Sequence, residues 1–261
     1  MSLDIWTSCA GPSNRRTLAL SLHRVVEAQH RNSTRALVDS LEEQELLERI
    51  IEDEKPPRPP GAAFAGLHYL LYTPFRYPPL KAGSRFGRAD ERSLFYGAKH
   101  VETALAEKAY YQLLFIAGSA AVLVPDPIAW TAFSVDVTTE AGIDLTAAPF
   151  AAHVREISSP SSYAASQALG AAMRADHVAA FTFVSARCPH RGTNAGLFEP
   201  IFKQRTPKGP MQTWSCRADR DGCEVGQVNA INKLIHRFAR TDFEVDGQLP
   251  APAFVGIDSG V

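Results

Sequence analysis

The sequence predicts an α+β protein with a mixed, mainly antiparallel β core, flanking helices and an N-terminal helical module. Short runs rich in aromatic and β-branched residues predict strands, and a 3.6-residue apolar periodicity predicts separate helices. Strands and helices do not alternate regularly, as a doubly wound parallel sheet would require. A chain of 261 residues, 45% of them hydrophobic, is long enough to bury a sizeable core.

The N-terminal part predicts two helices. Apolar residues recur at helical spacing over 15–30: Leu18, Leu22, Val25 and Val26. Cap-type residues then precede a second, Glu-rich helix that runs to about residue 54: Asn32, Ser33 and Thr34. The proline-rich run that starts at Lys55 ends this helix, because proline removes a backbone donor and fixes φ. The predicted organisation is a helical module over 1–55, a Pro-rich linker over 56–65 and a main domain over 66–261.

The main domain begins with an aromatic run over 67–79, which predicts a strand that ends at prolines. Further strands are expected over 93–98, 127–138, 178–185, 193–198, 211–216 and 224–228. A helix is expected from His100 onward. An Ala-rich helix is expected over 161–174, with Ser159 or Ser161 as its cap.

The helix that follows His100 carries a carboxylate on its inward side. At 100° per residue, Glu107 projects with Thr103, Tyr111 and Leu114, whereas Glu102, Lys108 and Gln112 project towards the other side. An inward carboxylate is costly unless it is paired, and Arg85 in a Gly-bounded loop is the nearest candidate partner. Considered alone, such a pair fits a structural ion pair as well as a functional site.

Charge and cysteine content exclude several classes of protein. The formal net charge of −1 gives no electrostatic reason to expect nucleic acid or an anionic membrane as a partner. The start lacks a secretory signal pattern, and no run of eighteen apolar residues occurs, so a cytoplasmic protein is expected. The spacing of Cys188, His190, Cys216 and Cys223 is poor for a closed zinc site, which predicts a metal-free protein. Common catalytic signatures such as a P-loop, HExxH or GxSxG do not occur.

The remaining candidates are distributed along the chain: Arg76, Arg85, Tyr96, Glu107, Ser185 and Asn194. Two arginines can hold a diphosphate, an aromatic ring can stack on a flat heterocycle, and a carboxylate can stabilise an oxocarbenium-like sugar. Each residue also has a purely structural interpretation. Tyr96 fits a core aromatic with a wet tip, and Ser185 fits a strand-end hydroxyl satisfied by backbone.

Five motifs carry a family resemblance: FRYPP at Arg76, GSRFG at Arg85, LFYGA at Tyr96, ETALAE at Glu107 and FVSAR at Ser185, followed by NAGLFEP. In order and local spacing over 67–200 they resemble the RES-domain proteins, which are named for an Arg, a Glu and a Ser. The sequence departs from that pattern where GSRFG has Phe-Gly in place of the Trp-Asn of many relatives, and in the short gap between the two arginines.

The resemblance implies an ADP-ribosyltransferase-like fold, NAD as the substrate, and a toxin neutralised by an Xre-type helix-turn-helix antitoxin. It implies catalytic roles for Glu107, Arg85 and Ser185, with Glu107 acting on the nicotinamide ribose. It implies cofactor-binding roles for Arg76 at the phosphates, Tyr96 at the nicotinamide, and Asn194.

Three hypotheses follow from these observations. The first is a toxin that transfers ADP-ribose from NAD to a protein. Longer RES-domain proteins resemble toxins that modify phosphoribosyl pyrophosphate synthetase, so that enzyme is one candidate target. The second is a toxin that destroys NAD by hydrolysis or phosphorolysis. The third is a binding module without catalysis, in which Arg85 and Glu107 form only an ion pair.

Overall fold

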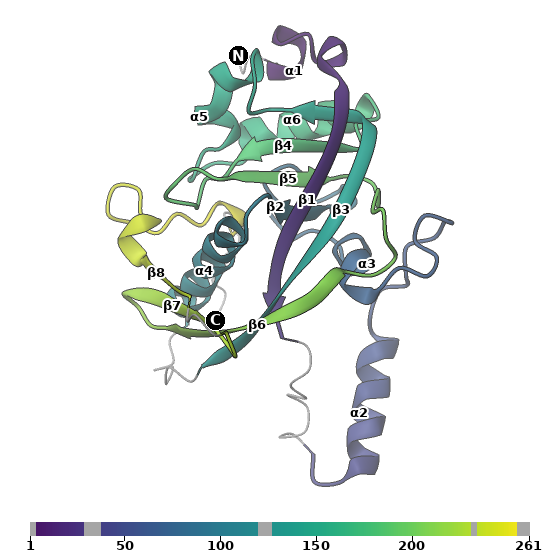
Figure 1. The fold of residues 1–261 in the computed structure, drawn as a ribbon, viewed down its shortest axis with the longest axis vertical. Coiled ribbons are helices and arrows are strands. Elements are labelled where there is room, and N and C mark those ends of the chain that lie inside the picture. Colours follow the sequence, from purple (N-terminus) through teal and green to yellow (C-terminus); the bar gives the residue numbers. More distant parts are fainter. Residues whose placement is uncertain (1–3, 29–37, 120–126, 231–233, 255–261) are drawn as a thin grey trace.

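The computed structural model describes residues 4–28, 38–119, 127–230 and 234–254 (Figure 1). The strands of these residues form one sheet in the order β1-β2-β5-β4-β3-β6-β7-β8, and β1 also pairs with β3. The strands β1 to β5 therefore close into a ring, and β6 to β8 extend from β3. β3 and β4 pair in parallel, whereas the other described pairs are antiparallel. The prediction of an α+β fold with a mixed, mainly antiparallel sheet is confirmed.

The strands are β1 Arg16–Glu27, β2 Phe95–Ala98, β3 Ile128–Asp144, β4 Ala180–Val184, β5 Thr193–Leu197, β6 Lys208–Ala218, β7 Gly222–Gln227 and β8 Ile235–Ala239. The α-helices are α1 Ile5–Ser8, α2 Leu41–Asp53, α3 Tyr69–Arg76, α4 Val101–Gly118, α5 Val154–Ile157 and α6 Ala164–Ala175. The predicted strands that correspond to β2 to β7 and the predicted helices that correspond to α2, α4 and α6 are confirmed. β8 was not predicted. None of the described helices is long and apolar enough to cross a membrane.

β1 corrects the prediction of a helix over 15–30. It pairs antiparallel with β3 from Leu18 opposite Thr139 to Glu27 opposite Trp130. The apolar residues of this segment fit a strand as well as a helix, because Leu18 and Leu22 also share one face of a strand, and both are buried. The expected helical module over 1–55 is therefore wrong in its first half, which forms part of the ring of strands.

α2 confirms the second predicted helix and projects from the body of the protein (Figure 1). It begins at a capping box, in which the Ser40 Oγ accepts from the Glu43 N–H at 3.1 Å and the Glu43 carboxylate accepts from the Ser40 N–H at 3.2 Å. The expected caps at 32–34 lie outside the described residues. The proline-rich stretch over 56–65 forms neither helix nor strand.

α3 replaces the strand predicted over 67–79. Its buried residues Leu70, Leu71 and Phe75 recur at helical spacing, and the His68 Nδ1 accepts from the Leu70 N–H at 3.3 Å. The aromatic content of this run suggested a strand, but one apolar helical face packs better beside the sheet. The helix ends before the Pro78-Pro79 pair, where proline prevents its continuation.

α4 packs closely on the sheet and positions the site. Small and aliphatic side chains fill its inner face, including the fully buried Leu105, Ala106 and Ala109, which contact a core containing Trp130 and Trp214. Of the residues expected to project away from Glu107, Glu102 is exposed, but Gln112 is 6% exposed and buried. α6 begins at Tyr163 without a side-chain cap, so the expected caps Ser159 and Ser161 are wrong.

Candidate active site

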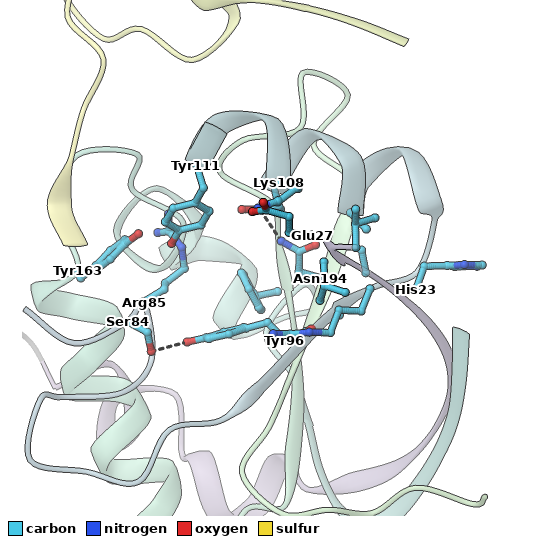
Figure 2. A pocket seen from close by; sticks show the side chains of 17 residues that line it. His23, Glu27, Ser84, Arg85, Tyr96, Lys108, Tyr111, Tyr163 and Asn194 are labelled. Atoms are coloured by element: carbon cyan, nitrogen blue, oxygen red, sulfur yellow. Dashed lines mark hydrogen bonds between the residues drawn. The ribbon is translucent and has the colours of Figure 1, made fainter. Parts of the chain in front are cut away.

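A cavity of about 390 Å³ lies beneath α4 (Figure 2). Its walls come from α4, from β1 and β2, from the loop before β2, from Tyr163 at the start of α6, and from single residues of β4 and β5. Four of the predicted site residues line it: Arg85, Tyr96, Glu107 and Asn194. The fold thus gathers residues that are far apart in the sequence around one cavity.

Glu107 is held by the ends of two strands. Its Oε1 accepts hydrogen bonds from the Ser185 Oγ at 2.6 Å and the Asn194 Nδ2 at 2.6 Å. The Ser185 hydroxyl in turn accepts from the backbone N–H groups of Arg187 at 3.1 Å and Cys188 at 2.9 Å, so its own proton is directed at the carboxylate. Two donors therefore fix one carboxylate oxygen, and Oε2 makes no hydrogen bond to a described residue.

The side-chain amide of Asn194 has one polar atom that is available to a ligand. Its Nδ2 is used by Glu107, and its Oδ1 is buried without a hydrogen-bond partner among the described residues. A buried unsatisfied acceptor costs about 1–3 kcal/mol. Because Asn194 lines the cavity, a donor group of a bound ligand would satisfy it.

Arg85 does not pair with Glu107, which corrects the predicted ion pair. No ion pair between described residues includes Arg85. Its Nη1 donates to the Ser159 carbonyl at 2.7 Å, and its guanidinium lies 4.9 Å from the centroid of the Tyr163 ring. The residue is only 9% exposed. The cation thus lines the cavity without a neutralising carboxylate and is available to an anion.

Tyr96 forms a wall of the cavity and supports the loop of Arg85. Its hydroxyl accepts from the Phe86 N–H at 2.9 Å and lies 3.0 Å from the Ser84 Oγ, while its ring meets Phe183 edge to face. Burial raises the pKa of Tyr96 to about 12, so the phenol is neutral at physiological pH. Tyr96 therefore positions the segment that carries Arg85.

Arg76 does not line the cavity. Its Nε donates to the Pro56 carbonyl, and its Nη1 pairs with the Glu52 carboxylate at 3.2 Å. This residue ties α2 and the proline-rich stretch to the end of α3. Arg76 therefore does not join Arg85 in this cavity, because α3 directs its last side chain towards α2.

Arg24 is the second arginine of the cavity, and the sequence interpretation missed it. Its Nη1 donates to the Tyr96 carbonyl at 2.6 Å, and its Nε is buried without a partner among the described residues. Burial lowers the pKa of Arg24 to about 10, which leaves it charged at neutral pH. The signal was present in the sequence, since a strand over 18–24 places Arg24 on the same face as the apolar residues 18, 20 and 22.

Cys188, Cys216 and Cys223, whose spacing is poor for a zinc site, are free and buried. Cys216 and Cys223 lie with their Sγ atoms 3.0 Å apart, and the Cys188 Sγ accepts from the Thr103 hydroxyl at 3.7 Å. Across the described residues, no three His, Cys, Asp or Glu side chains are grouped so as to hold a metal ion.

A family model described as the RES domain matches residues 58–219 of this chain. The chain belongs to the RES domain family. Arg85, Tyr96, Glu107, Ser185 and Asn194 lie within the matched residues of the RES domain, whereas Arg24 on β1 precedes them.

No curated protein sequence matches the chain. Among solved structures, the M. tuberculosis MbcT–MbcA toxin–antitoxin complex matches this RES-domain protein with a TM-score of 0.45 and 15% sequence identity, over 84% of this chain and 94% of that chain.

Proposed function

We propose that this RES-domain protein is the toxin of a toxin–antitoxin pair, and that it cleaves NAD at the bond between nicotinamide and ribose and transfers ADP-ribose to a protein. The observation that carries the proposal is the fixed position of the Glu107 carboxylate. This carboxylate is fixed by Ser185 and Asn194 in a cavity that also holds Arg24 and Arg85, neither of which forms an ion pair with a described residue. A positioned carboxylate next to unpaired cations suits a ligand that has both a sugar centre and phosphates.

The proposed chemistry uses the fixed carboxylate. As the N-glycosidic bond breaks, its electron pair leaves with neutral nicotinamide and positive charge develops on C1′ of the ribose. A carboxylate held beside C1′ stabilises that charge more in the transition state than in the ground state. An acceptor nucleophile then bonds to C1′ and loses its proton. Ser185 and Asn194 hold Glu107 in place, so little reorganisation accompanies the reaction.

The proposed binding mode uses the two cations and the polar wall. Arg85 and Arg24, the latter in the role that the sequence suggested for Arg76, match the two negative charges of the diphosphate. The unsatisfied Asn194 Oδ1 accepts from a ribose hydroxyl or from the carboxamide of nicotinamide. The Tyr96 ring offers an apolar wall for the nicotinamide.

The fate of ADP-ribose is tested with NAD labelled in its adenylate part. The antitoxin-free protein is incubated with labelled NAD and a cell lysate, and phosphoribosyl pyrophosphate synthetase is one candidate among the proteins that take up label. Label on a protein supports the transferase. Label only in free ADP-ribose or in ADP-ribose phosphate indicates hydrolysis or phosphorolysis. Absence of any nicotinamide release overturns the proposal and leaves the non-catalytic binding module.

The proposed partner is an Xre-type helix-turn-helix antitoxin in the cytoplasm, which silences the toxin by covering the cavity. Occlusion needs no allosteric step, because an antitoxin that covers this concave cavity would block the binding of NAD directly. The intact complex should bind NAD far more weakly than the free toxin does. Equal affinity of the two forms for NAD would exclude occlusion.

A further inference from the structure

Lys108 lines the cavity from α4, directly after Glu107 (Figure 2). The sequence placed it on the opposite side of the helix. In the structure its ammonium lies 5.7 Å from the centroid of the Trp130 ring, and the residue is partly buried. Lys108 therefore faces the ligand space without contributing to the hydrogen bonds that hold Glu107.

The Glu27 carboxylate on the cavity wall acts on the Lys108 ammonium but does not form an ion pair with it. No ion pair between described residues includes Lys108. Burial lowers the pKa of Lys108, Glu27 at the cavity wall opposes that effect, and the nearby Arg24 adds to it. A desolvated cation beside a second cation is unfavourable unless an anion neutralises them.

Lys108 and Arg24 approach the cavity from different elements. Lys108 comes from the helix that covers it, and Arg24 comes from β1 beneath. With respect to the described residues, Arg24 keeps an unsatisfied buried Nε, and its Nη1 donates to a neutral carbonyl. An oxyanion with several acceptor oxygens would receive hydrogen bonds from both groups and would separate the two like charges.

We propose that Lys108 is a further binding residue of this cavity and that, with Arg24, it holds a phosphate group of the ligand. This inference rests on the proposed function for the identity of that ligand as NAD.

The test compares ligands that differ in phosphate. Lys108→Met keeps an unbranched chain over Trp130 but removes the charge. In a Glu107→Gln background, in which turnover should be slower by about 10²-fold or more, calorimetry measures the affinity for NAD, for nicotinamide riboside and for inorganic pyrophosphate. Loss of one charge-assisted contact should weaken the binding of NAD and pyrophosphate by about 10-fold or more, and change that of nicotinamide riboside by less than about 2-fold.

Matched variants separate this role from simple packing. Lys108→Arg should retain most of the affinity for NAD, and Lys99→Met, at an exposed site outside the cavity, should leave all three affinities unchanged. Lys108→Gln replaces the Met variant if the latter does not fold. An equal loss for NAD and nicotinamide riboside, or no loss for either phosphate ligand, would overturn the role of Lys108. Lys108-dependent binding of pyrophosphate by a protein that does not bind NAD would retain the phosphate site and refute the proposed function.

Discussion

Replacing Glu107 with Gln removes the negative charge of the site and leaves an acceptor oxygen in the same place. The amide oxygen can still accept from the Ser185 hydroxyl and the Asn194 amide, which lie 2.6 Å from the Glu107 Oε1. Turnover of NAD should fall by about 10²-fold or more, which corresponds to about 2.7 kcal/mol of transition-state stabilisation. The affinity for NAD should change little, because the proposed binding mode places the diphosphate on other residues.

The stability of this variant distinguishes catalysis from a structural role. Because Arg85 donates to the Ser159 carbonyl and not to Glu107, the substitution leaves no newly unpaired cation. Two charge-assisted hydrogen bonds become neutral ones, and the carboxylate no longer has to be desolvated, so the free energy of unfolding should change by less than about 2 kcal/mol. Thermal unfolding, calorimetry with NAD and the rate of nicotinamide release measure the three quantities.

Glu102→Gln is the control for these measurements. Glu102 is exposed in the first turn of α4, where its charge contributes at most about 1 kcal/mol through the helix dipole. Its loss should leave turnover unchanged. A folded Glu107→Gln protein with near-normal turnover would refute the catalytic assignment. A loss of activity that only follows the unfolded fraction would support the structural alternative.

Three further predictions concern Arg24, Ser185 and Asp144. Arg24→Gln should weaken NAD binding by about 10-fold or more, whereas Arg76→Gln should leave that affinity unchanged; calorimetry on both variants checks this, and a larger loss for Arg76→Gln would contradict the placement of the two residues. Ser185→Ala removes one of the two donors that position the Glu107 carboxylate, so steady-state kinetics should show a lower kcat with little change in KM; normal kcat would argue against positioning by Ser185. Burial would raise the pKa of Asp144, but hydrogen bonds from Thr146 and Thr182 outweigh it and lower that pKa. The stabilisation is thus present at neutral pH and is lost as pH falls through the ordinary and then the lowered pKa. Asp144→Asn should lower the free energy of unfolding at about pH 7 by about 1–3 kcal/mol and weaken its dependence on acid, as urea unfolding can measure; an unchanged acid dependence would contradict this.

Local patterns predicted most of the fold. The strands β2 to β7 and the helix α4 were found because their composition or periodicity agrees with their final state. β1 and α3 were misassigned because their apolar residues fit both periods. The pairing of β1 with β3 selects the strand over the helix for this segment, and the residues of β3 lie more than 100 positions later in the sequence. Local periodicity does not contain that information.

The site was predicted as a set of residues but not as a set of contacts. The motif order placed Glu107, Ser185 and Asn194 together, and the structure joins them by hydrogen bonds. The expected partner of the carboxylate, Arg85, is instead held by a backbone carbonyl of a later loop. Arg24 was missed because its segment was predicted as a helix, and a helix does not place Arg24 on the same face as the inward apolar residues. Each of these errors therefore arose because the position of the residue depends on contacts between segments that are distant in the sequence.

The structure of the Glu107→Gln protein with bound NAD is the most direct test of the proposed site. We expect the nicotinamide ribose beside residue 107, with its C1′ within about 4 Å of the side chain, a distance at which a charge would act strongly in a partly buried site. The diphosphate should lie against Arg24 and Arg85. NAD bound outside this cavity, or bound inside it with the ribose turned away from residue 107, would contradict the proposed role of Glu107.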